Sequence, residues 1–590
     1  MAISFGTWVL GFDGGDFPPR EQIGGKGWSI AHMSAVGLNV PPAFVVTTRA
    51  CHAYLSDESA PRGIDEEIAA GIAWLEARTG RAFGGGPAPL LISVRSGAAV
   101  SMPGMMDTVL NVGITSATEP LLARLCGSQR FARDTHCRFL ESFSRVVLDA
   151  PPLEPSPRDD PAAWRDALAT AGAAVPDDAS AQLAMAVHAV FRSWNSRRAR
   201  RYRAHHGIPD DAGTAVLVQA MVFGNRDDRS GTGVLFSRNP LTGEPVPYGE
   251  FLPRAQGEDI VSGTVTPHPL DTMRDTLPDA YDKLLAAARL LEHAHGDMQD
   301  IEFTVESGEL FLLQARTGKR SPEAAARMAV DMLDEGLVSP AIALSRVSPD
   351  QIRSCLRPRL AEGAAARGHA LRHGEGASPG IGRGVVVTDP DEAERRARLG
   401  EDVVLVRAAT SPDDLHGMIA ARAVVTENGG STSHAAVVGR ALGRPCVVGC
   451  GAGAVAALAG RVVTVDGAAG LVYDGELAVV APDEDSDPVL QRLCRVAEAH
   501  APVAVHASHD RSGASADADF SGLSDLGTLR RALAALRAGA TVSGPIFADD
   551  DPAVEAAIDA GVAGIITRPR LPALLASIRY DRAKPLAACE

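Results

Sequence analysis

Short runs of apolar residues alternate with amphipathic stretches over the first half of the chain. The segments 215–222 and 310–313 are rich in residues that favour β-strands. The segment 322–335 instead carries apolar residues at the spacing of a helix. This alternation predicts a large domain of mixed α and β structure over residues 1–345. Within it, the segment 151–176 is rich in Pro, Ala and Asp and is predicted to be a surface connection.

The pattern changes after residue 345. The segment 346–374 is heavy in Arg, Ala and Gly and is predicted to be a linker. Short strands with few helices between them predict a compact mixed sheet over residues 375–480; they are expected at 384–388, 402–406, 447–449 and 462–466. The tail, residues 481–590, predicts a further linker and a short α/β unit. The fold class expected for the whole chain is therefore α/β and α+β multidomain.

Composition and charge narrow the possible partners. Of the 590 residues, 45% are apolar and 22% are charged, as in ordinary globular proteins. The formal net charge of −16 argues against nucleic acid or an anionic membrane as the main partner. No run of 18 apolar residues predicts a membrane span, and the first ten residues lack the pattern of a secretory signal. The eight cysteines form no CxxC pair, which favours buried free thiols and a cytoplasmic location.

The segment 429–436, Gly-Gly-Ser-Thr-Ser-His-Ala-Ala, lies between a run typical of a strand and a run typical of a helix. A histidine at such a turn suits reversible phosphorylation, because the imidazole of His434 is a nucleophile. Backbone N–H groups at the helix start, with Gly430, Thr432 and Ser433 around them, can hold phosphoryl oxygens. The alternative is a helix-capping Ser/Thr cluster beside a structural histidine.

Two segments of the first domain are candidates for binding phosphate groups. The segment 23–27, Ile-Gly-Gly-Lys-Gly, places Lys26 among glycines whose backbone amides can approach a phosphate. It is not a Walker A motif, and an ordinary turn is the alternative. Arg95 stands at the end of an apolar run and is followed by a long loop of small residues, which suits anion binding. For this segment the alternative is a flexible surface loop.

Polar side chains interrupt two more apolar runs, at residues 300–303 and 312–316. Adjacent strands that carry Glu302 and Gln314 would place oxygen ligands around a Mg²⁺ ion bound to the phosphates of a nucleotide. Arg316 could then contact the phosphate chain. A structural pair of polar side chains across two strands is the alternative.

Together these motifs resemble the pyruvate phosphate dikinase family of PEP-utilising enzymes. The resemblance runs from about residue 24 to about residue 568 and includes the segment 95–108, Arg-Ser-Gly-Ala-Ala-Val-Ser-Met-Pro-Gly-Met-Met-Asp-Thr. It implies an ATP-grasp nucleotide-binding domain at residues 1–345 and a swivelling phosphohistidine domain at residues 375–480. In this family ATP and orthophosphate react so that a histidine takes the β-phosphoryl group, while AMP and pyrophosphate leave.

The resemblance also implies a role for individual residues, by position. Thr432 lies where plant members of the family are regulated by phosphorylation. The other assignments are Lys26 and Arg95 for the ATP phosphates, Arg316 for the transferred phosphoryl group, Glu302 and Gln314 for Mg²⁺, and His434 as the phosphoryl carrier.

The tail departs from the family pattern. Members of the family end in a (β/α)₈ barrel that binds pyruvate or phosphoenolpyruvate, and such a barrel takes about 250 residues. We expect a barrel remnant in the tail, in which residues 560–568 resemble the opening strand and its Arg568. Cys589 is not expected to replace the catalytic cysteine of the family.

This departure shapes the expected function. We expect an ATP-dependent phosphotransferase that passes its phosphoryl group to an unknown small molecule or partner protein, rather than to pyruvate bound by this chain alone. One alternative is a split dikinase whose barrel is a separate subunit. The other is a nucleotide-binding regulatory protein without turnover.

Overall fold

The computed structural model describes residues 3–587, apart from residues 14, 16, 58, 101, 103–107, 151, 152, 154–159, 262–264, 357, 358, 362, 481, 508–515 and 524. Cys589 and most of the loop that follows Arg95 therefore lie outside the described residues. In the ranges that are described, no helix combines the length and the apolar character needed to cross a membrane.

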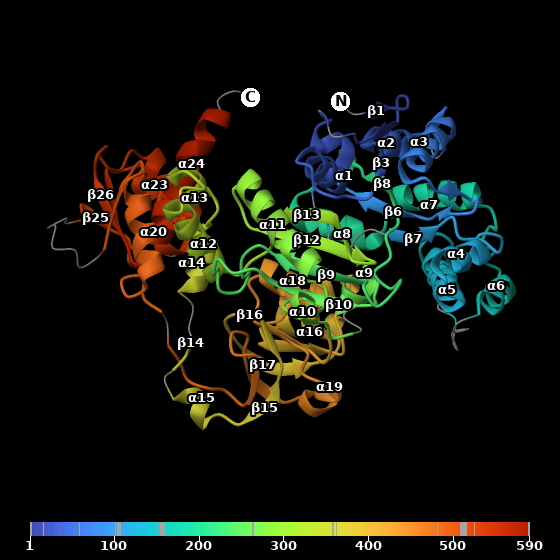
Figure 1. The fold of residues 1–590 in the computed structure, drawn as a ribbon. Helices are drawn as coiled ribbons and strands as arrows, with labels where there is room; N and C mark the ends of the chain where they lie inside the picture. The colour runs from blue at the N-terminus through green and yellow to red at the C-terminus, as the bar shows by residue number, and fades with distance from the viewer. Residues whose placement is uncertain are drawn as a thin grey trace.

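Two antiparallel sheets form the N-terminal part of the molecule (Figure 1). Helix α1 (Arg20–Ala35) packs against strands of both sheets and so connects them. The first sheet has the order β1 (Ile3–Ser4), β2 (Val9–Gly11), β3 (Ala43–Val46), β8 (Ala215–Ala220), β6 (Ile92–Gly97) and β7 (Thr108–Val112). The second has the order β11 (His268–Pro269), β10 (Tyr248–Pro253), β9 (Gly231–Phe236), β12 (Gln299–Glu306) and β13 (Glu309–Thr317).

Helices cover these sheets and extend the first one sideways (Figure 1). A small two-stranded sheet of β4 (Ala82–Phe83) and β5 (Pro89–Leu90) lies beside them. The helices are α2 (Thr48–Asp57), α3 (Ile64–Thr79), α4 (Glu119–Cys126), α5 (Gln129–Val146), α6 (Pro161–Thr170), α7 (Ala179–Ser193), α8 (Arg197–His206), the 3₁₀ turn η1 (Asp210–Ala212), α9 (Gly257–Val261), α10 (Thr272–Thr276) and α11 (Pro278–His295).

The described part of the segment 151–176 contains a packed helix, which corrects the expectation of a surface connection. Helix α6 buries Trp164 and Leu168. Asp160 caps the helix, because its carboxylate accepts hydrogen bonds from the backbone N–H groups of Ala162 and Ala163 at 3.0 and 3.3 Å. With so few large apolar side chains, this helix has too weak a periodic signal to be recognised between prolines.

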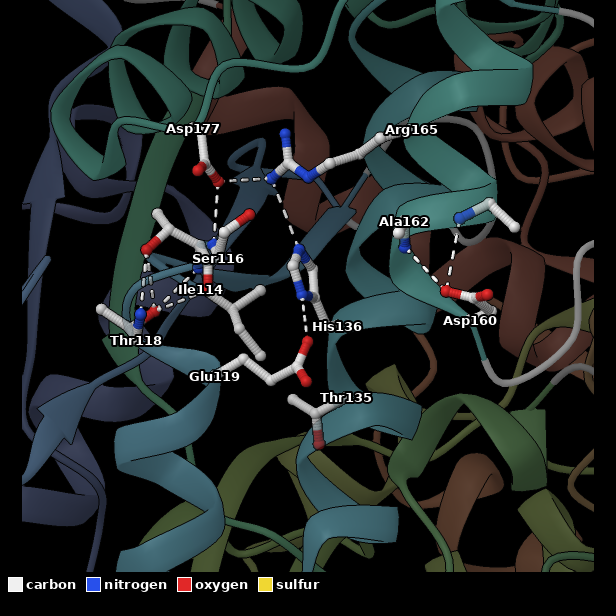
Figure 2. Close-up of polar contacts among 12 residues, drawn as sticks. Ile114, Ser116, Thr118, Glu119, Thr135, His136, Asp160, Ala162, Arg165 and Asp177 are labelled. Atoms are coloured by element: carbon white, nitrogen blue, oxygen red, sulfur yellow. Dashed lines mark hydrogen bonds and ion pairs between the residues drawn. The ribbon is translucent and has the colours of Figure 1, made fainter.

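A polar network holds helix α6 in place (Figure 2). Arg165 Nη2 donates to Asp177 Oδ1 at 2.7 Å and lies 3.4 Å from Nε2 of the buried His136. On its other side, His136 Nδ1 lies 2.7 Å from Glu119 Oε2. Burial lowers the pKa of His136. The hydrogen bonds of this network fix the helices to one another.

The two faces of the second sheet differ in chemistry. Leu235, Ile301 and Phe303 lie on one face and pack into a core with Leu284 and Leu291 of α11. Because neighbouring residues of a strand point to opposite faces, the residues between these apolar positions point to the other face. That other face carries the polar side chains of the candidate site.

An eight-stranded mixed sheet forms the next domain, in agreement with the expected short strands. Its central strands run parallel, with the order β17, β18, β19, β20, and its outer strands are antiparallel. The full order is β15 (Ala370–His373), β22 (Leu471–Asp474), β21 (Val462–Asp466), β17 (Ile381–Val387), β18 (Val403–Arg407), β19 (Ala423–Thr426), β20 (Cys446–Val448) and β16 (Glu375–Ser378). Its helices are α15 (Ala364–Arg367), α16 (Pro390–Arg398), η2 (Pro412–Asp414), α17 (Leu415–Ala420), α18 (His434–Ala441) and α19 (Ala454–Leu458).

The tail shares a core with three helices that precede the eight-stranded domain. Met328 of α12 (Pro322–Asp334) and Ile352 of α14 (Pro349–Cys355) belong to the same core as Leu493 and Leu574 of the tail. Helix α13 (Pro340–Ser345) lies with them (Figure 1). The predicted linker 346–374 thus begins with a packed helix. The helices of the tail are α20 (Pro488–Glu498), α21 (Leu526–Leu533), α22 (Ile546–Asp549), α23 (Asp551–Asp559) and α24 (Leu571–Ala587).

The sheet of the tail is parallel and has four strands among the described residues. Its order is β24 (Ala504–His506), β27 (Gly564–Ile566), β26 (Thr541–Ser543) and β25 (Ala518–Asp519). In a (β/α)₈ barrel consecutive strands are neighbours, but here β24 lies beside β27 rather than beside β25. The multidomain α/β and α+β fold class is confirmed, whereas the origin of the tail as a barrel remnant stays a prediction.

Two chain segments connect the eight-stranded domain with the body formed by α12–α14 and the tail (Figure 1). They pair with each other through the short antiparallel strands β14 (Arg359–Leu360) and β23 (Val479–Val480). The eight-stranded domain is therefore joined to the rest of the molecule by a narrow, two-stranded connection and by the docking contacts described below.

Candidate functional site

A break in helix α1 brings its Lys26 close to the end of strand β6. Gly24 has φ 70° and ψ 166° inside the helix, a conformation that favours glycine. A β-carbon at this position would overlap the carbonyl oxygen of Gly97. The backbone N–H of Gly25 donates to the carbonyl of Ala98 at 2.9 Å. The two glycines therefore allow the close approach that places Lys26 beside the side chains of the site.

Arg95 of β6 reaches across to the second sheet. Its Nη2 lies 3.2 Å from Glu302 Oε2 and 3.3 Å from Gln314 Oε1, and its Nη1 donates to the carbonyl of Leu313 at 3.4 Å. Only 13% of the Arg95 side chain and 26% of the Glu302 side chain are exposed. This ion pair joins the two sheets at the polar face of the second.

The polar residues of β12 and β13 form two cross-strand pairs. Glu302 lies opposite Gln314, and Asp300 lies opposite Arg316. Residues two apart on a strand point to the same face, so all four side chains share one face of the sheet. Arg316 Nε donates to Oδ2 of the buried Asp300 at 2.8 Å. The sequence singled out the segment of Asp300 but gave that residue no role.

The charges of this cluster influence one another strongly. Burial and the guanidinium groups of Arg95 and Arg316 lower the pKa of Lys26 to about 7, although Glu302 acts in the opposite direction. Burial would raise the pKa of Glu302, but Arg95, Arg316 and Lys26 together hold it below its ordinary value. Asp300 is the main cause of a raised pKa of Arg316. Three cations at close range make this a site for a polyanion.

The oxygen atoms of the cluster fit a Mg²⁺ ion that arrives with a nucleotide. Glu302 Oε2 and Gln314 Oε1 both lie within hydrogen-bond distance of Arg95 Nη2, so the two oxygens are neighbours in the cluster. In the part of the chain that the structure describes, no three His, Cys, Asp or Glu side chains gather to hold a metal by themselves. Mg²⁺ commonly takes one or two protein oxygens and fills its remaining positions with phosphates and water.

His434 is the first residue of α18 and follows the Gly429-Gly430 turn after β19. Its Nδ1 lies 3.2 Å from Thr410 Oγ1, and its Nε2 is buried without a hydrogen-bond partner among the described residues. Burial lowers the pKa of His434 to about 4, although Asp414 acts in the opposite direction. A small cavity of about 10 Å³ adjoins the ring and is lined by Thr410, Asn428 and Ser433. The imidazole is therefore neutral and has one free nitrogen.

The loop before His434 is docked on the second sheet through Glu250 of β10. Glu250 accepts a hydrogen bond from Ser431 Oγ at 2.9 Å and another from Thr432 Oγ1. Burial, together with the nearby Glu375, raises the pKa of Glu250, while these two hydroxyl groups act against that shift. A β-carbon on Gly430 would overlap the Glu250 carboxylate. The absence of a side chain at residue 430 therefore permits the docking.

A second group of contacts fixes the same loop. Arg440 of α18 donates to the carbonyl groups of Ser431 at 2.8 Å and Ala377 at 2.9 Å. Its guanidinium group lies 5.7 Å from the ring centre of Phe236 in β9. The helix that carries the histidine thus contacts the second sheet directly, as Figure 1 shows for α18 and β9.

Register places Glu250 on the polar face that carries Glu302, Gln314 and Arg316. Glu250 lies opposite Val234 of β9, and Val234 lies opposite Glu302 of β12. Side chains of directly opposed residues share a face, and two strand spacings are roughly 10 Å. The loop that carries His434 is therefore docked two strands away from the candidate Mg²⁺ ligands, on the same side of the sheet.

Comparison with known proteins gives the family. The model described as pyruvate phosphate dikinase, AMP/ATP-binding domain, matches residues 20–79, 57–281 and 271–337. The model described as PEP-utilising enzyme, mobile domain, matches residues 399–470. The chain belongs to the pyruvate phosphate dikinase family. The resemblance seen in the sequence is thereby confirmed.

Individual members of the family align over most of this chain. Pyruvate, phosphate dikinase 2 of Oryza sativa subsp. japonica is 44% identical over 454 residues, which are 73% of this chain and 51% of that protein. The pyruvate, phosphate dikinases of Rhizobium meliloti and Clostridium symbiosum are 41% and 40% identical and align with 81% and 80% of this chain. The chain spans 51–59% of the length of these three relatives.

The positions expected from the family resemblance fall into two groups in the structure. Five of them lie in one cluster, while His434, Gly430, Thr432 and Ser433 lie on the docked domain. Ser433 precedes α18, but its hydroxyl makes no capping bond and has no partner among the described residues. The five clustered residues are Lys26, Arg95, Glu302, Gln314 and Arg316.

Glu250 was missed by the sequence-based reasoning. Its strand, Tyr-Gly-Glu-Phe-Leu-Pro, carries a single carboxylate, which Gly249 and Phe251 flank. That signal was available, but a single carboxylate on a strand is commonly solvent-exposed. Its role became visible only from the strand order and from the hydroxyl groups that contact it.

Proposed function

We propose that the chain is an ATP-dependent phosphotransferase in which His434 takes a phosphoryl group from ATP. The observation that carries this proposal is the docking of the His434 loop on the face that holds Arg95, Glu302 and Gln314. A structural histidine in a capping cluster would not account for its buried, unpartnered nitrogen on a domain docked beside a polyanion site.

In this proposal the cluster binds and orients the phosphates of ATP. Lys26 and Arg95 hold the phosphate chain, and Arg316, fixed by Asp300, contacts the phosphoryl group that is transferred. Glu302 and Gln314 would hold Mg²⁺, which supplies charge neutralisation of the phosphates when it is bound. The low dielectric of the partly buried cluster strengthens these interactions.

His434 is the proposed nucleophile. When its proton is on Nδ1, that nitrogen donates to Thr410 Oγ1 and Nε2 keeps a free lone pair. The overall half-reaction consumes ATP and orthophosphate. His434 gains the β-phosphoryl group, the γ-phosphoryl group passes to orthophosphate to give pyrophosphate, and AMP leaves.

Thr432 supports the loop and is a candidate for regulation in this proposal. Its hydroxyl is buried against the carboxylate of Glu250. A phosphoryl group on Thr432 would place two negative charges against that carboxylate, which disfavours the docked arrangement. Phosphorylation of Thr432 is therefore expected to oppose docking.

The acceptor that receives the phosphoryl group from His434 is proposed to be a small molecule or a partner protein rather than pyruvate bound by residues 1–590 alone. Arg568, at the end of β27, is already paired with Asp483 at 2.9 Å and Asp485 at 2.8 Å. These carboxylates compete with an anionic substrate for the guanidinium group of Arg568. The split dikinase remains the alternative in which a second subunit supplies the pyruvate site; a regulatory protein without turnover is the other.

The test is labelling with ATP carrying ³²P at the β-phosphate, in the presence of Mg²⁺ and orthophosphate and without pyruvate. We expect acid-labile label on the protein together with AMP, both lost in His434→Ala. The matched control is His416→Ala, since His416 lies on α17 of the same domain and contacts Asp391 at 2.9 Å. Label that persists in His434→Ala, or no label despite ATP binding, would contradict the proposal.

A further inference from the structure

A cavity of about 460 Å³ lies where three parts of the molecule meet. One wall is the connection 318–322 between β13 and α12. The second wall comes from residues 346–354 around the start of α14, and the third from residues 440–443 at the end of α18. The volume is in the range of small-molecule sites, and the cavity exists only while the domain of His434 is docked.

The walls of this junction cavity carry a local excess of positive charge. The cavity is lined by four cationic side chains, Lys319, Arg320, Arg346 and Arg440. Among the described residues that line it, Asp350 is the one carboxylate. Asp350 is 86% exposed and already paired with an arginine of α14. For a chain with a net charge of −16, four cations at one cavity indicate an anionic ligand.

Two of the four cations share a single buried carboxylate. Arg320 donates to both oxygens of Asp297 at 2.6 and 3.1 Å, and Arg346 lies 3.6 Å from the same side chain. Arg346 also donates to the carbonyl of Gly296. These bonds hold both guanidinium groups at the wall, while Asp297 compensates for one of the two charges.

The other two cations form no ion pair among the described residues. Arg440 is 2% exposed, donates only to neutral carbonyl groups, and has an Nε without a hydrogen-bond partner in the described part of the chain. Lys319 is exposed to the cavity side and has no hydrogen-bond or ion-pair partner in those ranges. Burial and the neighbouring Arg316 lower the pKa of Lys319. An anion in the cavity would give Lys319 and Arg440 a charged partner.

We propose that the junction cavity binds a multiply charged phosphate anion, with pyrophosphate as the species that best matches its charge and size. Four cations suit an ion with several negative oxygens, and the guanidinium groups can bind phosphate oxygens in pairs. Because its walls come from three parts of the molecule, a bound anion stabilises the docked arrangement over any arrangement that separates them. The proposal goes beyond phosphorylation of His434 and does not require it.

The lysine content of the chain provides a direct assay. There are four lysines, Lys26, Lys283, Lys319 and Lys584, so acetylation of each can be followed separately by mass spectrometry. Without ATP and Mg²⁺, we expect pyrophosphate to slow acetylation of Lys319 about tenfold at about ten times its Kd. Lys283, which is exposed on α11, should react at an unchanged rate and serves as internal control.

Different anions distinguish the possible occupants. Orthophosphate tests a smaller ion of the same chemistry, and protection of Lys319 by it would also support a phosphate site. If sulfate at the same ionic strength protects Lys319 equally, the protection is general charge screening rather than binding at a site, and the proposal is overturned. Protection of Lys26 by pyrophosphate with Lys319 unaffected would place the anion in the nucleotide cluster and would also overturn it.

Substitution gives an independent measurement. Lys319→Gln should weaken pyrophosphate binding about tenfold in calorimetry, because a charge-assisted hydrogen bond is lost. Lys283→Gln removes the same charge outside the cavity and should leave binding unchanged. Arg346→Gln is less suitable, because the bonds to Gly296 and Asp297 make it part of the fold. Since no ATP is present, failure of this test leaves the proposed labelling of His434 untouched. Unchanged binding in Lys319→Gln would refute the site.

Discussion

The lowered pKa of Lys26 predicts that ATP binding weakens steeply with rising pH. An isolated lysine stays protonated well above pH 9, but burial and two neighbouring arginines bring the pKa of Lys26 to about 7 in the free protein. ATP brings several negative charges to the same place and favours the protonated amine. Binding of ATP is therefore coupled to uptake of a proton by Lys26.

The size of the effect follows from the two protonation states. With a pKa of about 7, roughly one tenth of the free protein carries a protonated Lys26 at pH 8 and roughly one hundredth at pH 9. If only this form binds ATP tightly, the Kd rises about tenfold per pH unit above 7, which corresponds to about 1.4 kcal/mol per unit. At pH 8 the uptake is then about 0.9 proton per bound ATP.

Calorimetry between pH 7.5 and pH 9, in buffers of different ionisation enthalpy, measures both the Kd and the proton uptake. Lys26→Arg keeps its charge over this range and should give a nearly flat profile, whereas Lys283→Arg should keep the full slope. The γ-phosphate of ATP is already ionised there and is common to all variants. A flat profile of the unmodified protein, or a full slope in Lys26→Arg, would refute the reasoning.

Three further predictions concern docking, the helix break and the nucleophile. Glu250→Gln should leave the Kd for ATP within about twofold but slow labelling of His434 at least about tenfold, because Ser431 and Thr432 lose a charged hydrogen-bond acceptor. An equal loss of ATP binding and of labelling would instead place Glu250 in the nucleotide site. Gly24→Ala should lower the free energy of unfolding by about 2 kcal/mol or more in urea titrations, because residue 24 has positive φ and abuts Gly97. Gly27 has only ordinary contacts with its neighbours, so Gly27→Ala should lower the free energy of unfolding less. The pKa of His434, lowered to about 4, predicts an NMR titration midpoint below pH 5 and no loss of the neutral nucleophile down to pH 6. Because the histidine of the unfolded state binds a proton below about pH 6.5, the stability of the folded protein should fall from pH 6.5 toward pH 4. A titration midpoint near 6.5 would show that the ring is not desolvated.

Much of the proposed phosphate-binding cluster could be predicted from the sequence. Glu302, Gln314 and Arg316 interrupt apolar strands, and the period of two along a strand places Gln314 and Arg316 on one face. Lys26 stands among glycines, and Arg95 ends an apolar run before a loop of small residues. In each case the signal is local, because residue type and spacing alone indicate a polar side chain held by a regular element.

Packed helices in sequences rich in Pro, Ala, Asp or Arg could not be predicted in the same way. Helix α6 buries Trp164 and Leu168 within a segment that otherwise has the composition of a loop. Helix α14 buries Ile352 and Cys355 at the start of the expected linker. Both helices are stabilised by contacts with segments far away in the sequence, so their own composition underestimates their burial.

The docking of the His434 loop depends on strand order, which no local pattern contains. Glu250 and Glu302 share a face because β9 lies between β10 and β12 and pairs with both in register. A shift of one residue in either pairing would turn Glu250 toward α11 and leave Ser431 and Thr432 without their acceptor. The sequence therefore identifies the groups proposed to bind phosphate, whereas the register of two strand pairs places the loop of the proposed nucleophile on the same face. This is why substitutions at Glu250 and Gly430, rather than at the proposed phosphate-binding residues, are expected to separate ATP binding from phosphoryl transfer.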